Sequence, residues 1–277
     1  MRINPFKIAK TSTLAAVELV RMILQYKEIL WATTLVELKK RYAGSILGFL
    51  WVFIYPALLL CLYLFVYLVV FRVRFPGFSE YHYVLYIFSG LIPYLGFMEA
   101  LSLGTVSVKQ NIHLVKNVML PIELVPIRTV LIGIASQLVS LVILFFMVAL
   151  DGKLSFHILW LPIVLFLQIL FMMGLVLVLS FLAIPLPDIS YFVNLFLLLI
   201  LFISPIGFKP DMVPERLDFI IYLNPISYMA EMYRDCLLFG KFPNLYSASL
   251  YIFFSVATFA VGAAIFKKSK GFLMDHE

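Results

Sequence analysis

The stretch "ELKKRYAGSILGFLWVFIYP", residues 37–56, sets three consecutive cations against a long apolar run. Lys39, Lys40 and Arg41 close the charged part, and the apolar run that follows contains no charged side chain. Basic residues at such a border mark the cytoplasmic end of a transmembrane helix, where they lie among lipid headgroups. The stretch therefore predicts a membrane-spanning helix that begins near Ser45.

The composition of the whole chain supports a membrane location. Hydrophobic residues make up 64% of the 277 residues, charged residues make up 13%, and the mean hydropathy is +1.05. A soluble domain is about half apolar and about a quarter charged. Lipid can solvate the excess apolar surface when it is arranged in helices of about 20 residues. We therefore expect an all-α integral membrane protein.

Six apolar segments are long enough to span a bilayer, with edges uncertain by a few residues. They are residues 45–71, 83–108, 122–150, 158–184, 190–208 and 247–266. An even number of spans places residues 1–44 and the tail 267–277 on the same side. That side carries most of the 21 lysines and arginines, and short basic segments stay cytoplasmic. We expect both termini in the cytoplasm and the protein in the inner (plasma) membrane.

Residues 13–42 are too polar to span a bilayer and too apolar for a free tail. At about 100° per residue, polar side chains fall on one face and apolar ones on the other. The polar face holds Glu18, Arg21, Gln25 and Glu28, and the apolar face holds Leu19, Ile23, Tyr26 and Leu30. The segment predicts an amphipathic helix in the membrane plane, which can anchor the chain, act as a gate or dock a cytoplasmic partner.

Motifs for catalysis are absent from the sequence. There is no GxxxxGK[ST] phosphate loop, HExxH, GxSxG or CxxC. The four histidines and two cysteines are scattered over the chain: His82, His113, His157, His276, Cys61 and Cys236. They offer no metal-ligand or disulfide spacing. We expect no catalytic residue, metal or cofactor on this chain, so a second chain must hydrolyse any nucleotide.

Two carboxylates lie in unusual places. Glu99 sits inside the second span, where a charge costs on the order of 3 kcal/mol, so it must face protein, water or a partner, or carry a proton. The sequence leaves open whether Glu99 is functional or only makes a hydrogen bond between helices. Asp188 lies in the short turn 185–190, where we expect its side chain to cap the next helix.

Residues 204–240 are too long and too patterned for a plain outer loop. Pro214 can start one short helix, and the Asn224-Pro225 pair predicts the cap and first turn of a second helix that ends at Gly240. The apolar face of the second helix is expected to hold Ile226, Met229, Tyr233 and Leu237, with Ser227, Glu231, Arg234 and Asp235 mostly elsewhere. We expect both helices to re-enter the outer edge of the membrane as a vestibule or gate, or as a structural lid.

A short polar segment joins the second and third spans. Its side chains include Lys109, Gln110, Asn111, His113, Lys116 and Asn117, and Pro121 closes it. The pattern predicts a short amphipathic cytoplasmic helix over residues 109–120. Such a helix can dock into a groove of a partner, or it can be an ordinary connector.

A series of small motifs along the chain resembles one membrane protein family. In order, they are 41–45 (RYAGS), Leu47, Gly48, Trp51, Pro56, 90–92 (GLI), 116–121, Ser204, Pro205, Asn224, Pro225 and Arg234. This series resembles the permease subunits of ABC exporters of the polysaccharide class, which export O-antigen, capsule and teichoic acid polymers. The resemblance covers about residues 30–270. One departure is that Pro187 precedes Asp188, where the family often has an arginine.

The resemblance implies a homodimer with six spans per subunit, above two separate ATPase subunits that bind ATP and Mg²⁺. It implies a cytoplasmic gate helix before residue 45 and a coupling helix that contacts the ATPase over residues 109–120. It also implies outer gate helices over residues 211–240, which include Asn224, Pro225, Tyr233 and Arg234. No nucleic-acid partner is expected.

The cargo that the resemblance implies is a lipid-linked glycan, exported from the cytoplasm. Its phosphate or pyrophosphate is expected near the first span, at Lys39, Lys40, Arg41, Tyr42, Ser45, Trp51 and Tyr55. The rings of Trp51 and Tyr55 can stack on sugars, but the ordinary interfacial belt of aromatic residues is the favoured reason for a Trp and a Tyr at that depth.

Three other functions are compatible with parts of the sequence. A membrane glycosyltransferase is disfavoured because the outer acids form no DxD motif. A proton-coupled secondary transporter can use Glu99, but no inverted repeat is apparent. An ABC permease for a drug or a small lipid remains open, since the sequence does not reveal the width of the channel.

Overall fold

The computed structural model describes residues 5–42, 44–70, 72, 78–111 and 121–275, and within these residues every regular element is helical. Five described segments are long and apolar enough to cross a membrane: Phe53–Val70, Glu80–Gln110, Leu124–Leu150, Phe156–Leu182 and Leu245–Ser269. They correspond to five of the six predicted spans. The sequence-based assignment of an all-helical membrane protein is therefore confirmed.

The remaining predicted span is shorter than expected. It forms α8 (Ile189–Ile203), whose 15 residues extend about 22 Å at 1.5 Å per residue, against about 30 Å of hydrocarbon. The helix stops because Ser204 precedes Pro205 and adopts an extended backbone, with φ −73° and ψ 145°, as residues before proline do. The count of six spans accordingly stays a prediction.

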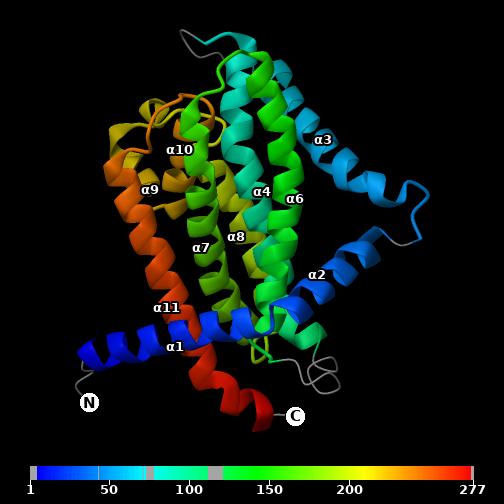
Figure 1. Cartoon of the computed structure of the whole chain (residues 1–277). Coiled ribbons are helices and arrows are strands. Elements are labelled where there is room, and N and C mark those ends of the chain that lie inside the picture. Colours follow the sequence, from blue (N-terminus) through cyan, green and yellow to red (C-terminus); the bar gives the residue numbers. More distant parts are fainter. Residues whose placement is uncertain (1–4, 43, 71, 73–77, 112–120, 276–277) are drawn as a thin grey trace.

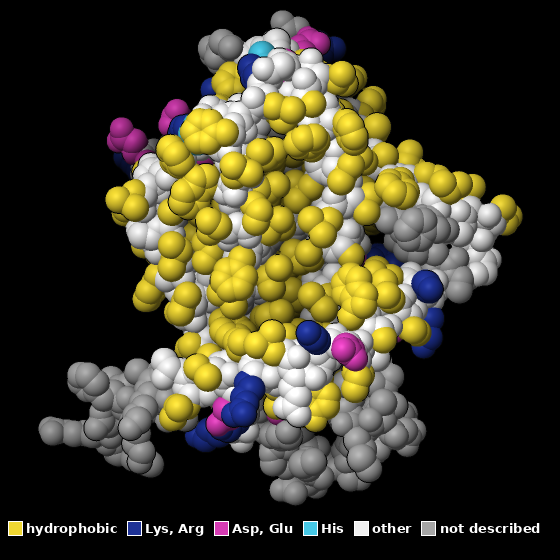
Figure 2. Space-filling model, viewed as in Figure 1, with side chains coloured by type: hydrophobic (Ala, Val, Ile, Leu, Met, Phe, Trp, Pro, Cys, Tyr) yellow, Lys and Arg dark blue, Asp and Glu magenta, His cyan; other side chains and the backbone are white. Residues whose placement is uncertain are grey.

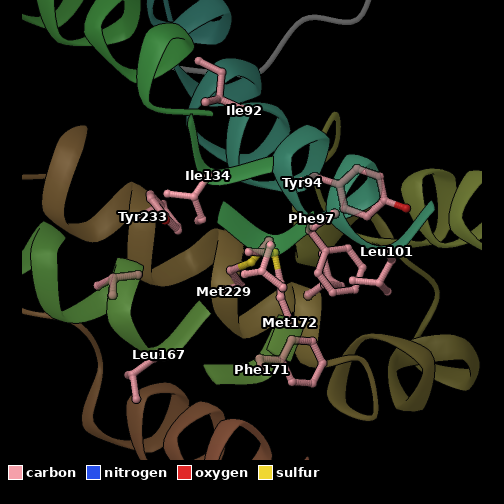
Figure 3. Packing of buried hydrophobic residues seen from close by; sticks show 14 of the residues in the cluster. Ile92, Tyr94, Phe97, Leu101, Ile134, Leu167, Phe171, Met172, Met229 and Tyr233 are labelled. Carbon is pink, nitrogen blue, oxygen red and sulfur yellow. The ribbon is translucent and has the colours of Figure 1, made fainter. Parts of the chain in front are cut away.

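The bundle is built around α4 (Glu80–Gln110). Its most apolar window is 78% buried inside the chain, because α6 (Leu124–Leu150), α7 (Leu161–Leu182), α8 and α10 (Pro225–Leu237) all pack against it. Phe97 of α4 stacks on Phe171 of α7, with ring centroids 5.7 Å apart (Figure 3). The central helix thereby fixes the positions of the residues that line the cavities described below.

Glycines bring two pairs of helices into close contact. A Cβ on Gly262 of α11 (Leu245–Asp275) would lie 2.3 Å from the carbonyl oxygen of Gly174 in α7. A Cβ on Gly133 of α6 would lie 2.5 Å from the carbonyl oxygen of Gly96 in α4. Small residues at helix contacts are typical of membrane bundles, where packing rather than hydrophobic exclusion holds helices together.

Two helices at the start of the chain lie across one end of the bundle (Figure 1). α1 (Pro5–Gln25) packs against α11, and α2 (Lys27–Tyr42) packs against α6. Leu19 and Leu30 are buried, whereas Glu18 and Glu28 are exposed, so the predicted amphipathic faces are confirmed. The segment is not one helix, however, because the chain turns at Tyr26.

The last predicted segments before α11 form at the opposite end of the bundle (Figure 1). Short turns at Pro210–Met212 and Glu215–Leu217 lead into α9 (Asp218–Tyr222). α10 follows and packs against α4, α7 and α11. Two short helices were predicted here, and two are present. Whether they re-enter a membrane stays a prediction.

The first apolar helix stands apart from the others (Figure 1). α3 (Trp51–Leu64) continues as a π-helical segment, Phe65–Val70. Only 11% of the window Phe53–Val70 is buried. Figure 2 shows an apolar surface over the flank of the bundle, with charged side chains gathered at its two ends. This distribution is typical of a protein surrounded by lipid.

We expect Gly262→Ala to lower the stability of the protein in detergent, by about 1–3 kcal/mol for an overpacked contact, because the added methyl group meets the backbone of Gly174. Thermal unfolding in detergent measures the change. The control is Val261→Ala, at a neighbouring position on α11 that is 48% exposed. Equal melting temperatures for the wild type and Gly262→Ala would show that α7 and α11 can move apart to admit the methyl group without a loss of stability.

Candidate functional site

An ion pair joins the end of α2 to the middle of α4. Arg41, in the last turn of α2, donates through Nη1 to Oε1 of Glu99. The side chain of Arg41 is 40% exposed and that of Glu99 is 17% exposed. A carboxylate inside an apolar span needs a partner, and the structure supplies one from a segment 58 residues away in sequence.

The ion pair lies at a cavity of about 420 Å³ between α3, α4, α6 and α8. Among the described residues that line it, Arg41 and Glu99 are the only ones with charged side chains. Its other polar lining residues are uncharged: Tyr55, Ser102, Ser136, Gln137, Ser140 and Asn194. The Ser102 hydroxyl donates to Oδ1 of Asn194 at 2.7 Å, which joins α4 to α8. We call this the inner cavity.

A second cavity, of about 380 Å³, adjoins the same arginine and is lined by Arg41, Ser45, Trp51 and Tyr55. Nε1 of Trp51 donates to the hydroxyl of Ser45 at 2.8 Å, which ties the start of α3 to the loop before it. We call this the entrance cavity. Because Arg41 and Tyr55 line both cavities, they stand at the border between the two.

Four of the seven residues predicted to bind a headgroup are thus brought together, namely Arg41, Ser45, Trp51 and Tyr55. Lys39 and Lys40 are exposed on α2 and line neither cavity. The side chain of Tyr42 lies outside the described part of the chain. Of the three cations, Arg41 alone is placed at both cavities.

A buried polar network lies next to the inner cavity. Nε2 of Gln137 in α6 donates to Oε1 of Gln168 in α7 at 3.0 Å and to the hydroxyl oxygen of Tyr233 in α10 at 2.9 Å. Nε2 of Gln168 also donates to the carbonyl oxygen of Pro93 at 3.0 Å. All three side chains are buried. The sequence reading missed the two glutamines, although lone amides inside apolar spans are a usable signal.

Arg234 is buried in α10 rather than lying on an exposed polar face. Its Nη2 donates to the carbonyl oxygen of Ile206 at 2.9 Å, its Nε donates to that of Tyr86 at 3.3 Å, and its guanidinium lies 3.7 Å from the Tyr86 ring centroid. A Cβ on Gly90 would lie 2.8 Å from Nη2, so glycine makes room for the cation. The sequence placed Arg234 away from the apolar face of α10, but it did not show that the side chain is buried with partners from other segments of the same chain.

The start of α10 agrees with its sequence signal. Asn224 caps the helix, since its Oδ1 accepts from the Ile226 N–H at 3.0 Å, and Pro225 occupies the first turn. Nδ2 of Asn224 also donates to the hydroxyl of Ser204 at 2.7 Å. By contrast, the cap predicted at Asp188 was wrong, because this residue precedes α8 without a side-chain capping hydrogen bond.

A third cavity, of about 560 Å³, lies beside α9 and α10. Asp235 lines it and is almost fully buried, with Oδ1 3.2 Å from Nζ of Lys241. Burial raises the pKa of the Asp235 carboxyl above its ordinary value, while Lys241 acts in the opposite direction. A cavity therefore lies within residues 204–240, where a vestibule, a gate or a structural lid was predicted, and the role of this segment stays a prediction.

Only part of the expected coupling segment can be located. Lys109 is exposed in the last turn of α4. Asn111 follows the helix and accepts from Nη2 of Arg128 at 3.1 Å. Arg128 also lies 3.7 Å from Glu37 of α2. His113, Lys116 and Asn117 lie outside the described residues, so the coupling helix stays a prediction.

Residues 28–238 match the family described as ABC-2 type transporter. The chain belongs to this family. An O-antigen export system permease protein RfbA of Klebsiella pneumoniae is 30% identical over 245 residues, which cover 88% of this chain and 92% of the relative. A protein of the same name from Myxococcus xanthus is 24% identical over 257 residues, which cover 92% of this chain and 97% of the relative.

As an ABC-2 permease, the chain is a transport subunit of the membrane, and its family works with an ABC ATPase. The match includes Arg41 of α2 and the whole of α10, and it ends at residue 238, directly after that helix. The inner cavity and the buried polar network therefore lie within the part of the permease that defines the family.

We expect Tyr233→Phe to destabilise the permease by about 1–2 kcal/mol, because Gln137 and Gln168 both lose a buried hydrogen-bond partner. Thermal unfolding in detergent measures the effect. Tyr191→Phe is the matched control, since Tyr191 is 75% exposed on α8. If both variants melt alike, the network contributes nothing to stability.

Proposed function

We propose that this permease forms the membrane channel of an ATP-driven exporter of a lipid-linked polysaccharide, of the O-antigen, capsule or teichoic acid type. The names of its relatives support this cargo. The main structural support is the position of Arg41 between the entrance cavity and the inner cavity. A guanidinium there can hold a phosphate by charge-assisted hydrogen bonds.

The chemistry of the two cavities suits the two parts of such a cargo. Lys39 and Lys40, exposed beside Arg41, attract anionic headgroups to the membrane surface. Trp51 and Tyr55 offer aromatic rings, which suit sugar faces as well as the interfacial belt. The inner cavity adds hydroxyl and amide groups, which can pair with the hydroxyl groups of a glycan.

A second copy of the chain would complete the channel. Glu99, Ser102 and Asn194 lie on a side of the bundle where α8 is largely exposed. Polar side chains at membrane depth are tolerated when they face protein or a water-filled cavity rather than lipid. A homodimer that faces its partner with α3 and α8 would meet this requirement.

Energy would come from separate ATPase subunits, which bind ATP and Mg²⁺ and contact residues 109–120. This arrangement places α1, α2 and both chain ends in the cytoplasm, and the protein in the inner membrane. The proton-coupled alternative is less well supported, because Glu99 already has Arg41 as its partner and the spans show no apparent inverted repeat. A drug or a small lipid as cargo would use the same cavities. The transport experiment below distinguishes such a cargo from a lipid-linked glycan.

We expect the purified permease to hydrolyse no ATP, and to export the glycan only when it is assembled with an ABC ATPase. Proteoliposomes with and without the ATPase, loaded with a lipid-linked glycan, test this expectation. A small fluorescent lipid is the competing cargo in the same vesicles. Transport of the small lipid but not of the glycan would contradict the proposed cargo. ATP hydrolysis by the isolated permease would contradict the proposal that a separate subunit hydrolyses ATP.

Neutralising Lys39, Lys40 and Arg41 together to Gln is expected to reduce export at least tenfold, while membrane insertion is retained, because the headgroup loses its cations. Cell export and the amount of protein in isolated membranes are measured in parallel. The control replaces Lys267, Lys268 and Lys270 by Gln, which removes the same charge from the end of α11. Loss of insertion in the first variant alone would show that its cations only anchor the first span.

A further inference from the structure

The charges at the inner cavity are balanced when no ligand is present. Arg41 and Glu99 carry opposite charges and contact one another, and within the described part of the chain no other charged side chain lines the cavity. Glu99 places a negative charge against the guanidinium at membrane depth, where a charged group needs partners within the protein or a water-filled cavity. With Glu99 in place, a phosphate that enters the cavity adds a negative charge to a neutral site.

Arg41 is also accessible from the other side, because it lines the entrance cavity with Ser45, Trp51 and Tyr55. An anion in that cavity and the carboxylate of Glu99 would meet the same guanidinium from two directions. A guanidinium forms its strongest contacts as paired, parallel hydrogen bonds to one carboxylate or phosphate. A phosphate that takes Nη1, the atom that donates to Glu99, into such a pair would displace the carboxylate.

We propose that Glu99 is a resident counter-anion that the phosphate of an incoming lipid headgroup displaces from Arg41. This proposal rests on the headgroup role of Arg41 in the proposed function. It gives Glu99 two effects. The carboxylate stabilises the empty site, and it lowers the affinity for phosphate, so that the headgroup can leave again after it has bound.

The displaced carboxylate would not be left without partners. Asn194, which has amide N–H groups, and Tyr55, which has a hydroxyl group, line the same cavity, and a glycan that fills the cavity brings hydroxyl donors of its own. A carboxylate accepts hydrogen bonds from hydroxyl and amide groups. Glu99 can thus exchange a cation for neutral donors, whereas a bare hydrocarbon lining would make the displacement prohibitively costly.

Binding of a polyprenyl phosphate to the full-length permease in nanodiscs tests the proposal without transport. Trp51 lines the entrance cavity, so a variant with Trp31→Phe and Trp160→Phe reports on this site through its remaining tryptophan. The parent polyprenol, which lacks the phosphate, measures binding by the lipid tail alone. Dissociation constants are compared among variants made in this single-tryptophan background.

We expect Glu99→Gln to bind the polyprenyl phosphate about tenfold more tightly and the polyprenol unchanged. Arg41→Gln should bind the phosphate at least tenfold more weakly. When Arg41→Gln is already present, Glu99→Gln should change the affinity for the phosphate less than twofold. The reason is that no guanidinium remains for which the Glu99 carboxylate and the phosphate could compete. Glu37→Gln is the matched control, since Glu37 on α2 faces Arg128, and its affinity should stay within twofold of the wild type.

The outcomes separate this proposal from the one on which it depends. If Arg41→Gln weakens binding and Glu99→Gln does not strengthen it, Glu99 is no competitor, and the headgroup role of Arg41 stands. If Arg41→Gln has no effect, the headgroup role itself fails. Should Glu99→Gln not fold, Glu99→Asp replaces it, because the shorter acid reaches Arg41 less well. A Kd that fails to tighten in this variant would overturn the competition.

Discussion

The structure depends on one constraint, which is that a charged or strongly polar group inside an apolar bundle must find a partner within the protein. Three sets of contacts meet this constraint. Arg41 pairs with Glu99, Gln137 and Gln168 join Tyr233, and Arg234 is held by backbone carbonyl groups and the ring of Tyr86. Each set joins helices that are distant in sequence, so the polar groups specify which helices become neighbours.

The central position of α4 follows from the same constraint together with side-chain size. Its glycines admit the groups that need partners: Gly90 leaves space for the guanidinium of Arg234, and Gly96 leaves space for the amide of Gln137. A Cβ at Gly96 would lie 2.4 Å from Oε1 of Gln137. Glycine weakens an isolated helix, but here it lets hydrogen bonds form that apolar residues cannot replace.

Signals that act over a few residues were read correctly from the sequence. The apolar segments, the faces of the helix around Leu19 and Leu30, and the cap at Asn224 all depend on neighbours along one helix. The reading failed at Asp188, where the expected side-chain hydrogen bond is not made. Periodicity placed Arg234 away from the apolar face of its helix, but it could not show that this side chain is buried.

The partner of Glu99 could not be predicted from the sequence, because it lies far away along the chain. Its charge in an apolar span showed that a partner was required, but nothing local pointed to Arg41, 58 residues earlier. The same holds for Gln137 and Gln168, whose hydrogen bonds join three helices. Periodicity describes one helix at a time, whereas these contacts depend on how whole helices are arranged.

The two ends of the bundle are connected by polar contacts rather than by apolar packing alone. Gln137 lines the inner cavity beside Glu99 and also bonds Tyr233 on α10, at the end of the bundle opposite α1. Moving α10 away from α6 would break buried hydrogen bonds that lipid cannot replace. The free-energy cost of this movement falls when other donors and acceptors replace the hydrogen bonds that are broken. Water and the hydroxyl groups of a glycan can supply these groups, whereas a purely apolar cargo cannot.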